Sequence, residues 1–255
     1  MESLKAIFFD QDGVIIDTEK DGHRVAFNET FKAFGYDFEW DVDRYQKLLQ
    51  IAGGKERMRH YFHEEGLFSD LSREEEDGFI KDLHKKKTEI FISLIETGKL
   101  PLRAGIRRLM QEGMERNLTL GVCTTANERS ANAIARGILK EIDFAFVLAG
   151  DMVSKKKPDP EIYLSGLEKA GLDPHECVVI EDSRNGILAA KAAGLYVVAT
   201  TNVYTENEDL SDADIIVTSL GDPDGEKGVL KKGDKAKLKF DGVVHVDQLM
   251  AYFSN

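Results

Sequence analysis

The stretch Ile7-Phe8-Phe9-Asp10-Gln11-Asp12-Gly13-Val14 joins three apolar residues to two carboxylates and a glycine. Residues 4–9 are mostly apolar and show no regular alternation, which is typical of a strand buried on both faces of a parallel sheet. In such sheets ligands bind beyond the carboxyl ends of the strands. The stretch therefore predicts an α/β fold in which Asp10 and Asp12 lie at the ligand-binding edge.

Similar apolar runs predict the remaining strands of this sheet. They cover residues 118–123, 145–149, 177–180 and 195–200, with a weaker run at 213–217. Helical patterns separate them at residues 103–117, 126–142, 160–172 and 183–194, and glycine lies at or near the end of the last two. This alternation predicts right-handed crossovers and a three-layer, Rossmann-like core with a parallel sheet.

Residues 20–98 break the alternation, because they are rich in charge and in helical periodicity and contain no convincing strand. We predict that residues 1–18 and 100–255 form the catalytic α/β core and that residues 19–99 form an inserted helical cap. Near the C-terminus, residues 221–237 are expected to form a solvated loop or hairpin. Residues 241–253 are expected to add an edge strand and a closing helix.

Composition limits the classes of partner. The chain has 255 residues, of which 42% are hydrophobic, and a formal net charge of −12. This charge argues against general nucleic-acid binding and against adhesion to anionic membranes, although a local cluster can still bind a small anion. No apolar run reaches the roughly 18 residues that span a bilayer. We expect a monomeric cytoplasmic protein, and an organellar protein with a trimmed targeting segment is the alternative.

The two cysteines lie in apolar runs, which favours small buried side chains over a disulfide or a metal pair. They are Cys123 in LGVCTT and Cys177 in CVVIED.

Polar side chains follow the predicted strands at the edge where a site is expected. Thr124, Thr125, Ala126 and Asn127 follow the second strand, Lys155-Lys156-Lys157-Pro158 comes after the third, and Glu181-Asp182 follows the fourth. Two like charges about 4 Å apart repel by roughly 4 kcal/mol at an effective dielectric near 20, so clustered carboxylates require a cation. A donor set of oxygens alone suits Mg²⁺. An EF-hand does not fit, because Val14 occupies its third ligand position.

The ordered motifs resemble the haloacid dehalogenase-like hydrolase superfamily. They are DQDGVIIDTE after the first strand, a threonine after the second, KKPDP later and ED after the fourth. The helical insert resembles the C1-capped subclass, and the resemblance covers essentially the whole chain. It implies an α/β core with an inserted helical cap and a Mg²⁺-dependent phosphoryl-transfer enzyme.

The resemblance also assigns roles to residues. Asp10 would be the nucleophile and Asp12 the general acid/base. Asp10, Asp12 (through its carbonyl), Glu181 and Asp182 would hold the metal. Thr124 and Lys157 would complete the catalytic set, and Thr125, Ala126 and Asn127 would bind substrate, the first two through their backbone N–H groups. Gln11 is given no role, and it departs from the hydrophobic residue that is usual there.

The cap contributes the residues expected to recognise substrate: Glu19, His23, Tyr45, Gly54, Lys55 and Arg57. The Gly-Gly-Lys-Glu-Arg run at a predicted helix start is either an anion-binding seat or an ordinary helix entry with solvated charges. His23 is either a substrate hydrogen-bonding group or a satisfied helix histidine. Together with DGVIIDTEKDGH and KKKPDP, these residues are similar to the CbbY-like sugar-bisphosphate phosphatases.

The sequence is therefore compatible with two enzymatic activities. The first is a phosphatase that hydrolyses a phosphorylated sugar, such as the pentulose bisphosphate xylulose-1,5-bisphosphate, through an aspartyl-phosphate. The alternative is a β-phosphoglucomutase-like sugar phosphomutase. Glu19 favours the phosphatase, because the mutases usually have threonine or a similar residue there. A catalytically silent binding protein is a third class, but every expected catalytic residue is present.

Overall fold

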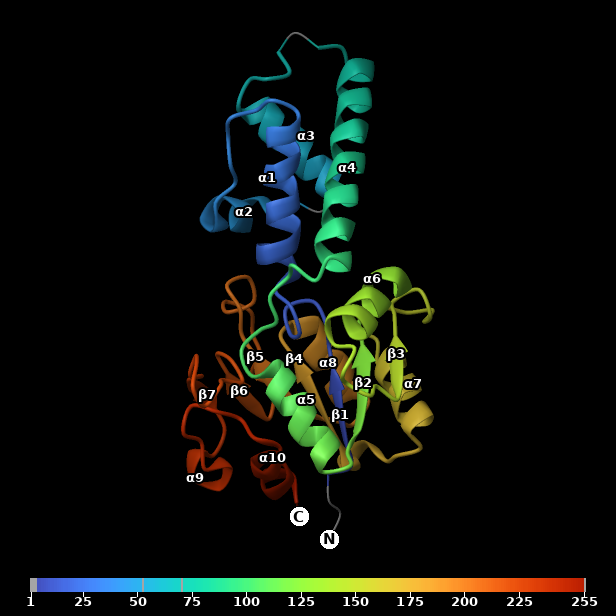
Figure 1. Ribbon diagram of the computed structural model, residues 1–255, viewed down its shortest axis with the longest axis vertical. Helices are drawn as coiled ribbons and strands as arrows, with labels where there is room; N and C mark the ends of the chain where they lie inside the picture. The colour runs from blue at the N-terminus through green and yellow to red at the C-terminus, as the bar shows by residue number, and fades with distance from the viewer. Residues whose placement is uncertain (1–3, 52, 70, 255) are drawn as a thin grey trace. The chain divides into compact units, whose positions relative to one another are not determined.

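The computed structural model describes residues 4–51, 53–69 and 71–254. The chain divides into two compact units, one made of residues 1–17 and 101–255 and the other of residues 18–100. The first unit contains the sheet with its helices, and the second contains only helices among its described residues (Figure 1). No helix in the described part of the chain combines the length and the apolar character needed to cross a membrane.

One seven-stranded sheet forms the first unit, in the order β3-β2-β1-β4-β5-β6-β7. The strands are β1 (Ala6–Phe9), β2 (Thr119–Cys123), β3 (Phe146–Leu148), β4 (Cys177–Glu181), β5 (Tyr196–Thr200), β6 (Ile215–Val217) and β7 (Leu230–Lys232). All neighbouring pairs are parallel except β6 and β7. The six predicted strands are confirmed. Because β1 lies between β2 and β4, the strand order reverses there, and such a switch point is where ligands bind.

Helices cover both faces of this sheet (Figure 1). The helices of this unit are α5 (Ile106–Glu115), α6 (Glu128–Ala133) with its π-helical continuation η2 (Ile134–Ile138), α7 (Glu161–Ala170), the 3₁₀ turn η3 (Pro174–Glu176), α8 (Arg184–Ala192), α9 (Lys235–Leu238) and α10 (Val246–Phe253). The four helices predicted between the strands form, each somewhat shorter than its sequence pattern. A three-layer α/β unit with a mostly parallel sheet is therefore confirmed.

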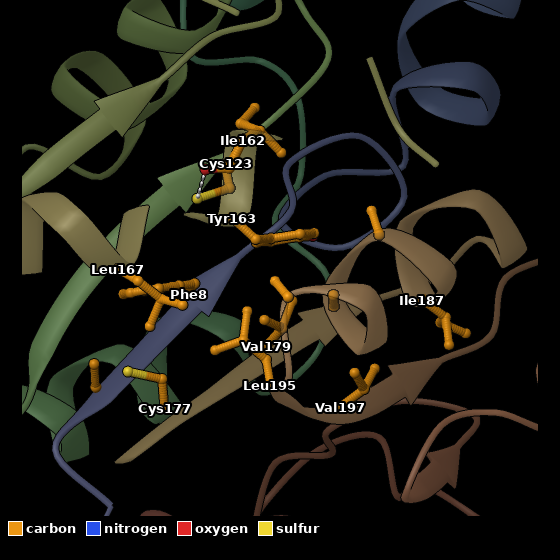
Figure 2. Close-up of a cluster of buried hydrophobic side chains, with 14 of the residues drawn as sticks. Phe8, Cys123, Ile162, Tyr163, Leu167, Cys177, Val179, Ile187, Leu195 and Val197 are labelled. Atoms are coloured by element: carbon orange, nitrogen blue, oxygen red, sulfur yellow. Dashed lines mark hydrogen bonds between the residues drawn. The ribbon is translucent and has the colours of Figure 1, made fainter. Parts of the chain in front are cut away.

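A continuous apolar core joins the sheet to α7 and α8. Figure 2 shows Phe8, Val179 and Val197 from the strands beside Tyr163 and Ile187 from the helices. Both cysteines are buried and free, as predicted, and Figure 2 shows each in this core.

The opposite face of the sheet packs against α5, and a glycine sets the close approach. A Cβ atom at Gly113 would lie 2.9 Å from a methyl carbon of Leu120, closer than real Cβ contacts. A helix can thus lie directly on the middle of the sheet, which holds β1 rigidly below the site.

The helical unit consists of the π-helical turn η1 (Thr18–His23), α1 (Arg24–Ala33), α2 (Val42–Leu48), α3 (Gly54–Glu64) and α4 (Arg73–Glu96). Its core is aromatic, and the largest fully buried side chains include Trp40, Phe27 and Phe62. Helix α4 begins at Arg73 because Ser72 and Glu75 form a capping box, in which each side chain accepts a hydrogen bond from the other residue's backbone N–H.

The predicted edge strand within residues 241–253 is wrong. Helix α10 forms there, but no strand lies within these described residues, and β7, at one of the two edges of the sheet, pairs antiparallel with β6. His245 and Gln248 form a capping box at the start of α10, so the chain before it leads into a helix. Gly233 directly follows β7 and has a positive φ of 126°, which lets the chain turn there. The expected loop or hairpin at 221–237 thus contains β7 and the first three residues of α9.

Candidate active site

Three carboxylates meet where β1 and β4 end. Asp10 directly follows β1, Glu181 is the last residue of β4, and Asp182 follows it. The two strands are adjacent and parallel, with Phe9 opposite Ile180. One oxygen from each of the three carboxylates lies within 4.8 Å of those of the others, and all three side chains are buried. Strand register alone therefore brings together residues that are far apart in the sequence.

Lys157 joins two of these carboxylates. Its Nζ atom donates to Oδ1 of Asp10 at 2.5 Å, to Oε1 of Glu181 at 2.6 Å and to the carbonyl of Cys123 at 3.0 Å. All three protons of the ammonium group thus have acceptors. Burial lowers the pKa of Lys157, but the charges of Asp10 and Glu181 outweigh it and raise the pKa above its ordinary value. The side chain therefore remains a cation in the site.

Glu181 is held from several directions. Its Oε1 accepts from Lys157 and, at 2.7 Å, from the hydroxyl of Tyr163 in α7. Its Oε2 accepts from the backbone N–H of Asp182 at 2.9 Å and of Ser183 at 3.3 Å. A Cβ atom at Gly186 would lie only 1.8 Å from Oε1, so the first turn of α8 can approach this carboxylate only with glycine there. Glu181 has little freedom to rotate.

The negative charge of the site exceeds what Lys157 balances. Burial first, and then the charges of Glu181 and Asp12, raise the pKa of Asp10 to about 8. Burial and the charges of Glu181 and Asp10 raise the pKa of Asp182 well above its ordinary value. A donor set of convergent, buried carboxylate oxygens with raised pKa values fits a hard divalent cation such as Mg²⁺. Asp12 is not one of the three grouped side chains, although its charge acts on Asp10.

The loop after β2 places the other predicted core residues. Thr124 is fully buried, and its Oγ1 accepts from the N–H of Ala126 at 3.1 Å. Thr125 is exposed, and Asn127 caps α6 by accepting from the N–H of Ser130 at 3.0 Å. The side chain of Asn127 is therefore committed to the helix.

The predicted cap residues belong to the helical unit, where several form one polar cluster. Tyr45 donates to Glu19 at 2.6 Å, and Arg57 donates to the Tyr45 oxygen at 3.1 Å. Arg57 is buried and also donates to the carbonyl of Leu48 at 3.0 Å, so it ties α3 to α2. Gly54 and Lys55 begin α3, and Lys55 is exposed.

Lys87, which was not predicted as a site residue, also belongs to this cluster. It is buried, and its Nζ lies 2.7 Å from Nδ1 of His23. Burial lowers the pKa of Lys87 to about 8, and burial and the charge of Lys87 lower the pKa of His23 well below its ordinary value. A neutral His23 that accepts through Nδ1 carries its proton on Nε2. The signal was that Ile80, Leu83 and Lys87 share one buried face of α4, so the lysine occupies a core position.

Tyr163, Arg103 and Asn202 were also missed, and each contacts the carboxylate group or the turn that follows β1. Tyr163 lies three residues after the KKPDP motif, which places it on the first turn of α7. Arg103 and Asn202 lie outside every motif.

Comparisons with known proteins agree on one family. The model of the haloacid dehalogenase-like hydrolases matches residues 4–194. A CBBY-like protein of Arabidopsis thaliana is 46% identical over 226 residues, which are 87% of this chain and 71% of the relative. A mutant CbbY of Rhodobacter sphaeroides, solved in complex with xylulose-(1,5)bisphosphate, is 37% identical with a TM-score of 0.62, and the match covers 85% of this chain and 94% of that one. A putative β-phosphoglucomutase of Thermotoga maritima is 27% identical with a TM-score of 0.65, covering 84% of this chain and 94% of that one.

Proposed function

Because the chain belongs to the haloacid dehalogenase-like hydrolases and is a phosphatase of that family, we propose that it hydrolyses a phosphorylated sugar with Mg²⁺ and through an aspartyl-phosphate. The substrate we propose is a pentulose bisphosphate such as xylulose-1,5-bisphosphate. The observation that carries the proposal is the grouping of Asp10, Glu181 and Asp182 within 4.8 Å, with Lys157 bonded to two of them.

The reaction would proceed in two displacements. A carboxylate oxygen of Asp10 attacks phosphorus, the bond between phosphorus and the sugar oxygen breaks, and Asp12 gives its proton to that oxygen. Asp12 then takes a proton from a water molecule, which attacks the aspartyl-phosphate. Inorganic phosphate leaves, and Asp10 and the proton on Asp12 are restored.

Lys157 and the loop after β2 would position the phosphoryl group. The ammonium group already contacts Asp10, so it orients the nucleophile and offsets negative charge as one anion approaches another. Thr124 and the N–H group of Thr125 would bind phosphoryl oxygens at the end of β2.

Asp10 and Asp182 would provide the carboxylate ligands of Mg²⁺, with Glu181 beside them and less available because Lys157 and Tyr163 already occupy its Oε1. When bound, the ion would offset the repulsion between the nucleophile and the phosphate dianion.

A substrate with two phosphates needs a second cationic seat, and the helical unit offers candidates. Lys55 is exposed on the first turn of α3, where backbone N–H groups also favour an anion. Lys55→Ala should raise KM for a bisphosphate much more than KM for a monophosphate. Lys47→Ala, an exposed lysine at the end of α2, is the matched control. Equal effects on both substrates would remove Lys55 from this role.

Phosphate release from a panel of sugar mono- and bisphosphates, measured with Mg²⁺ and with a chelator, tests the activity. We expect Mg²⁺-dependent release, fastest with the pentulose bisphosphate. If no substrate is turned over, the proposal fails. Formation of glucose 6-phosphate from β-glucose 1-phosphate without free phosphate would instead identify a mutase, which the similarity to the Thermotoga structure makes worth testing.

Asp10→Asn tests the covalent intermediate. An amide cannot attack phosphorus, so turnover should fall by ~10³-fold or more. The thermal midpoint should show that the variant is folded. Activity near that of the wild type would exclude Asp10 as the nucleophile.

A further inference from the structure

The end of β5 contacts the candidate site, although no predicted functional residue lies there. Asn202 follows this strand by two residues, and its Nδ2 donates to Oδ2 of Asp182 at 2.7 Å. Its Oδ1 accepts from the N–H groups of Tyr204 at 2.9 Å and Thr205 at 3.1 Å. Two N–H donors face one end of the amide, so that end is the oxygen and the NH₂ group faces Asp182.

A second side chain, that of Arg103, also holds this strand end. The guanidinium group of Arg103 donates to the carbonyl of Thr201 at 2.6 Å and to the carbonyl of Gly13. The backbone N–H of Arg103 donates to the carbonyl of Ile15 at 3.0 Å. Arg103 therefore joins the turn that follows β1 to the end of β5.

These groups are in direct packing contact. Gly13 has a positive φ of 90°, and a Cβ atom there would lie 2.1 Å from Oδ2 of Asp182 and 2.9 Å from Nδ2 of Asn202. The turn, Asp182 and Asn202 thus share one closely packed space. Asp182 is only 5% exposed, so little water is available to hydrate its carboxylate if Asn202 is removed.

We propose that Asn202 is a positioning residue that orients the Asp182 carboxylate for a divalent ion, and that Arg103 fixes the strand end from which Asn202 acts. The part that concerns the ion rests on the proposed function. Asp182 lies beside Asp10 and Glu181 and is repelled by both, so its convergent orientation needs a hydrogen-bond donor to hold it. An amide suits this place, because it stabilises the carboxylate without a positive charge that would compete with the ion.

The alternative is that Asn202 only closes the turn at residues 202–205 and does not position Asp182. Thr205→Val separates the two roles, since the Thr205 hydroxyl accepts from the N–H of Asn202 at 3.3 Å and, among the described residues, no hydrogen bond joins its side chain to Asp182. Arg108→Lys is the matched control for Arg103→Lys. Arg108 also donates to backbone carbonyls, those of Leu220 at 3.2 Å and Gly221 at 2.7 Å, but neither belongs to the turn after β1 or to β5.

Calorimetric titration of the substrate-free, full-length protein with Mg²⁺ tests the proposal. Asn202→Ala should raise the Kd for Mg²⁺ by about tenfold or more, and Arg103→Lys should raise it by a smaller factor of at least about three. Thr205→Val and Arg108→Lys should stay within about twofold of the wild type. With a sugar phosphate substrate, kcat of Asn202→Ala should fall while KM changes little. A Kd for Asn202→Ala within about twofold of the wild type, or equal to that of Thr205→Val, would overturn the proposal.

A failure of the proposed function is distinguishable from a failure of this inference. If the wild type itself binds no Mg²⁺, the proposed metal site is wrong. Crystal structures of the metal-free wild type and of Asn202→Ala then test whether Asn202 positions Asp182. A rotated Asp182 side chain in Asn202→Ala would support that role, and an unchanged one would overturn it.

Discussion

The Nζ atom of Lys157 lies 2.5 Å from Oδ1 of Asp10, although 147 residues separate the two along the chain. The lysine side chain is only 5% exposed. The pair therefore neutralises charge inside the protein, where solvent screens it little. Lys157 is at once a proposed catalytic group and a structural counter-ion.

Lys157→Met should lower the free energy of unfolding of the metal-free protein by about 3–5 kcal/mol, because it leaves two buried carboxylates without their cation. Urea denaturation in a chelator measures this. Lys155→Met is the control, since that lysine is 72% exposed and its ion pair with Asp159 should contribute about 0–1 kcal/mol. Equal midpoints for the two variants would contradict the counter-ion role.

Without metal, stability should fall as pH rises from 6.5 to 8. The raised pKa of Asp10, about 8, lets the folded protein hold a proton that the unfolded chain has lost, and the raised pKa of Asp182 acts in the same direction. A carboxyl group whose pKa is raised in the folded protein contributes to the free energy of unfolding at low pH, and this contribution is lost as pH approaches the raised pKa. The window starts at 6.5 because the lowered pKa of His23 acts in the opposite direction below its unfolded value.

The thermal midpoint in a chelator checks this prediction, and Asp10→Asn should flatten the profile. Added Mg²⁺ should raise the wild-type midpoint more at pH 8 than at pH 6.5, since at the higher pH it displaces fewer protons. A metal-free midpoint that rises across this window would show that the carboxylates do not carry extra protons.

Lys87 should make substrate affinity dependent on pH. Burial lowers the pKa of this amine to about 8, while the charge of Glu19 favours the ammonium form and the charge of Arg57 opposes it. As pH rises from 7 to 9 the amine loses its charge, so KM for a sugar bisphosphate should rise. Lys87→Met should raise KM at pH 7 by about tenfold or more and remove this rise.

Lys86→Met is the matched control for Lys87→Met, because Lys86 is exposed on the same helix. Its KM and its pH profile should follow the wild type. If Lys87→Met keeps the wild-type pH profile, another group controls substrate binding in this range.

Gln11→Leu should stabilise the protein. Gln11 is 1% exposed, and among the described residues neither polar atom of its side chain has a hydrogen-bond partner. A leucine of similar size removes that desolvation penalty, so the free energy of unfolding should rise by about 1–3 kcal/mol with turnover unchanged. Gln50→Leu, at an exposed position, should change it little. A loss of turnover in Gln11→Leu would reveal a role for the amide in the site.

Local sequence patterns predicted the parallel sheet well, because strands buried on both faces need long apolar runs. The edge strand β7 escaped detection, since a three-residue edge strand with two lysines has no such run. The carboxylates of the site could be predicted from the sequence, because each lies at the carboxyl end of a predicted strand. Lys87 was not predicted, because a run of three lysines is typical of a solvated surface, although its spacing from Ile80 and Leu83 places it on the buried face of α4. Arg103 acts on backbone carbonyls, and a motif of side chains cannot reveal such contacts.

The amino-acid sequence by itself determined the order of strands and helices and the acidic residues at the ends of β1 and β4, because periodicity and local propensity are written in neighbouring residues. Only the tertiary structure decided which distant groups form hydrogen bonds with these acidic residues. Lys157 donates to Asp10, Tyr163 to Glu181 and Asn202 to Asp182. Those partners depend on register and on helix rotation, which are set by the packing of the whole unit. Buried charge is stabilised only by groups within hydrogen-bond distance.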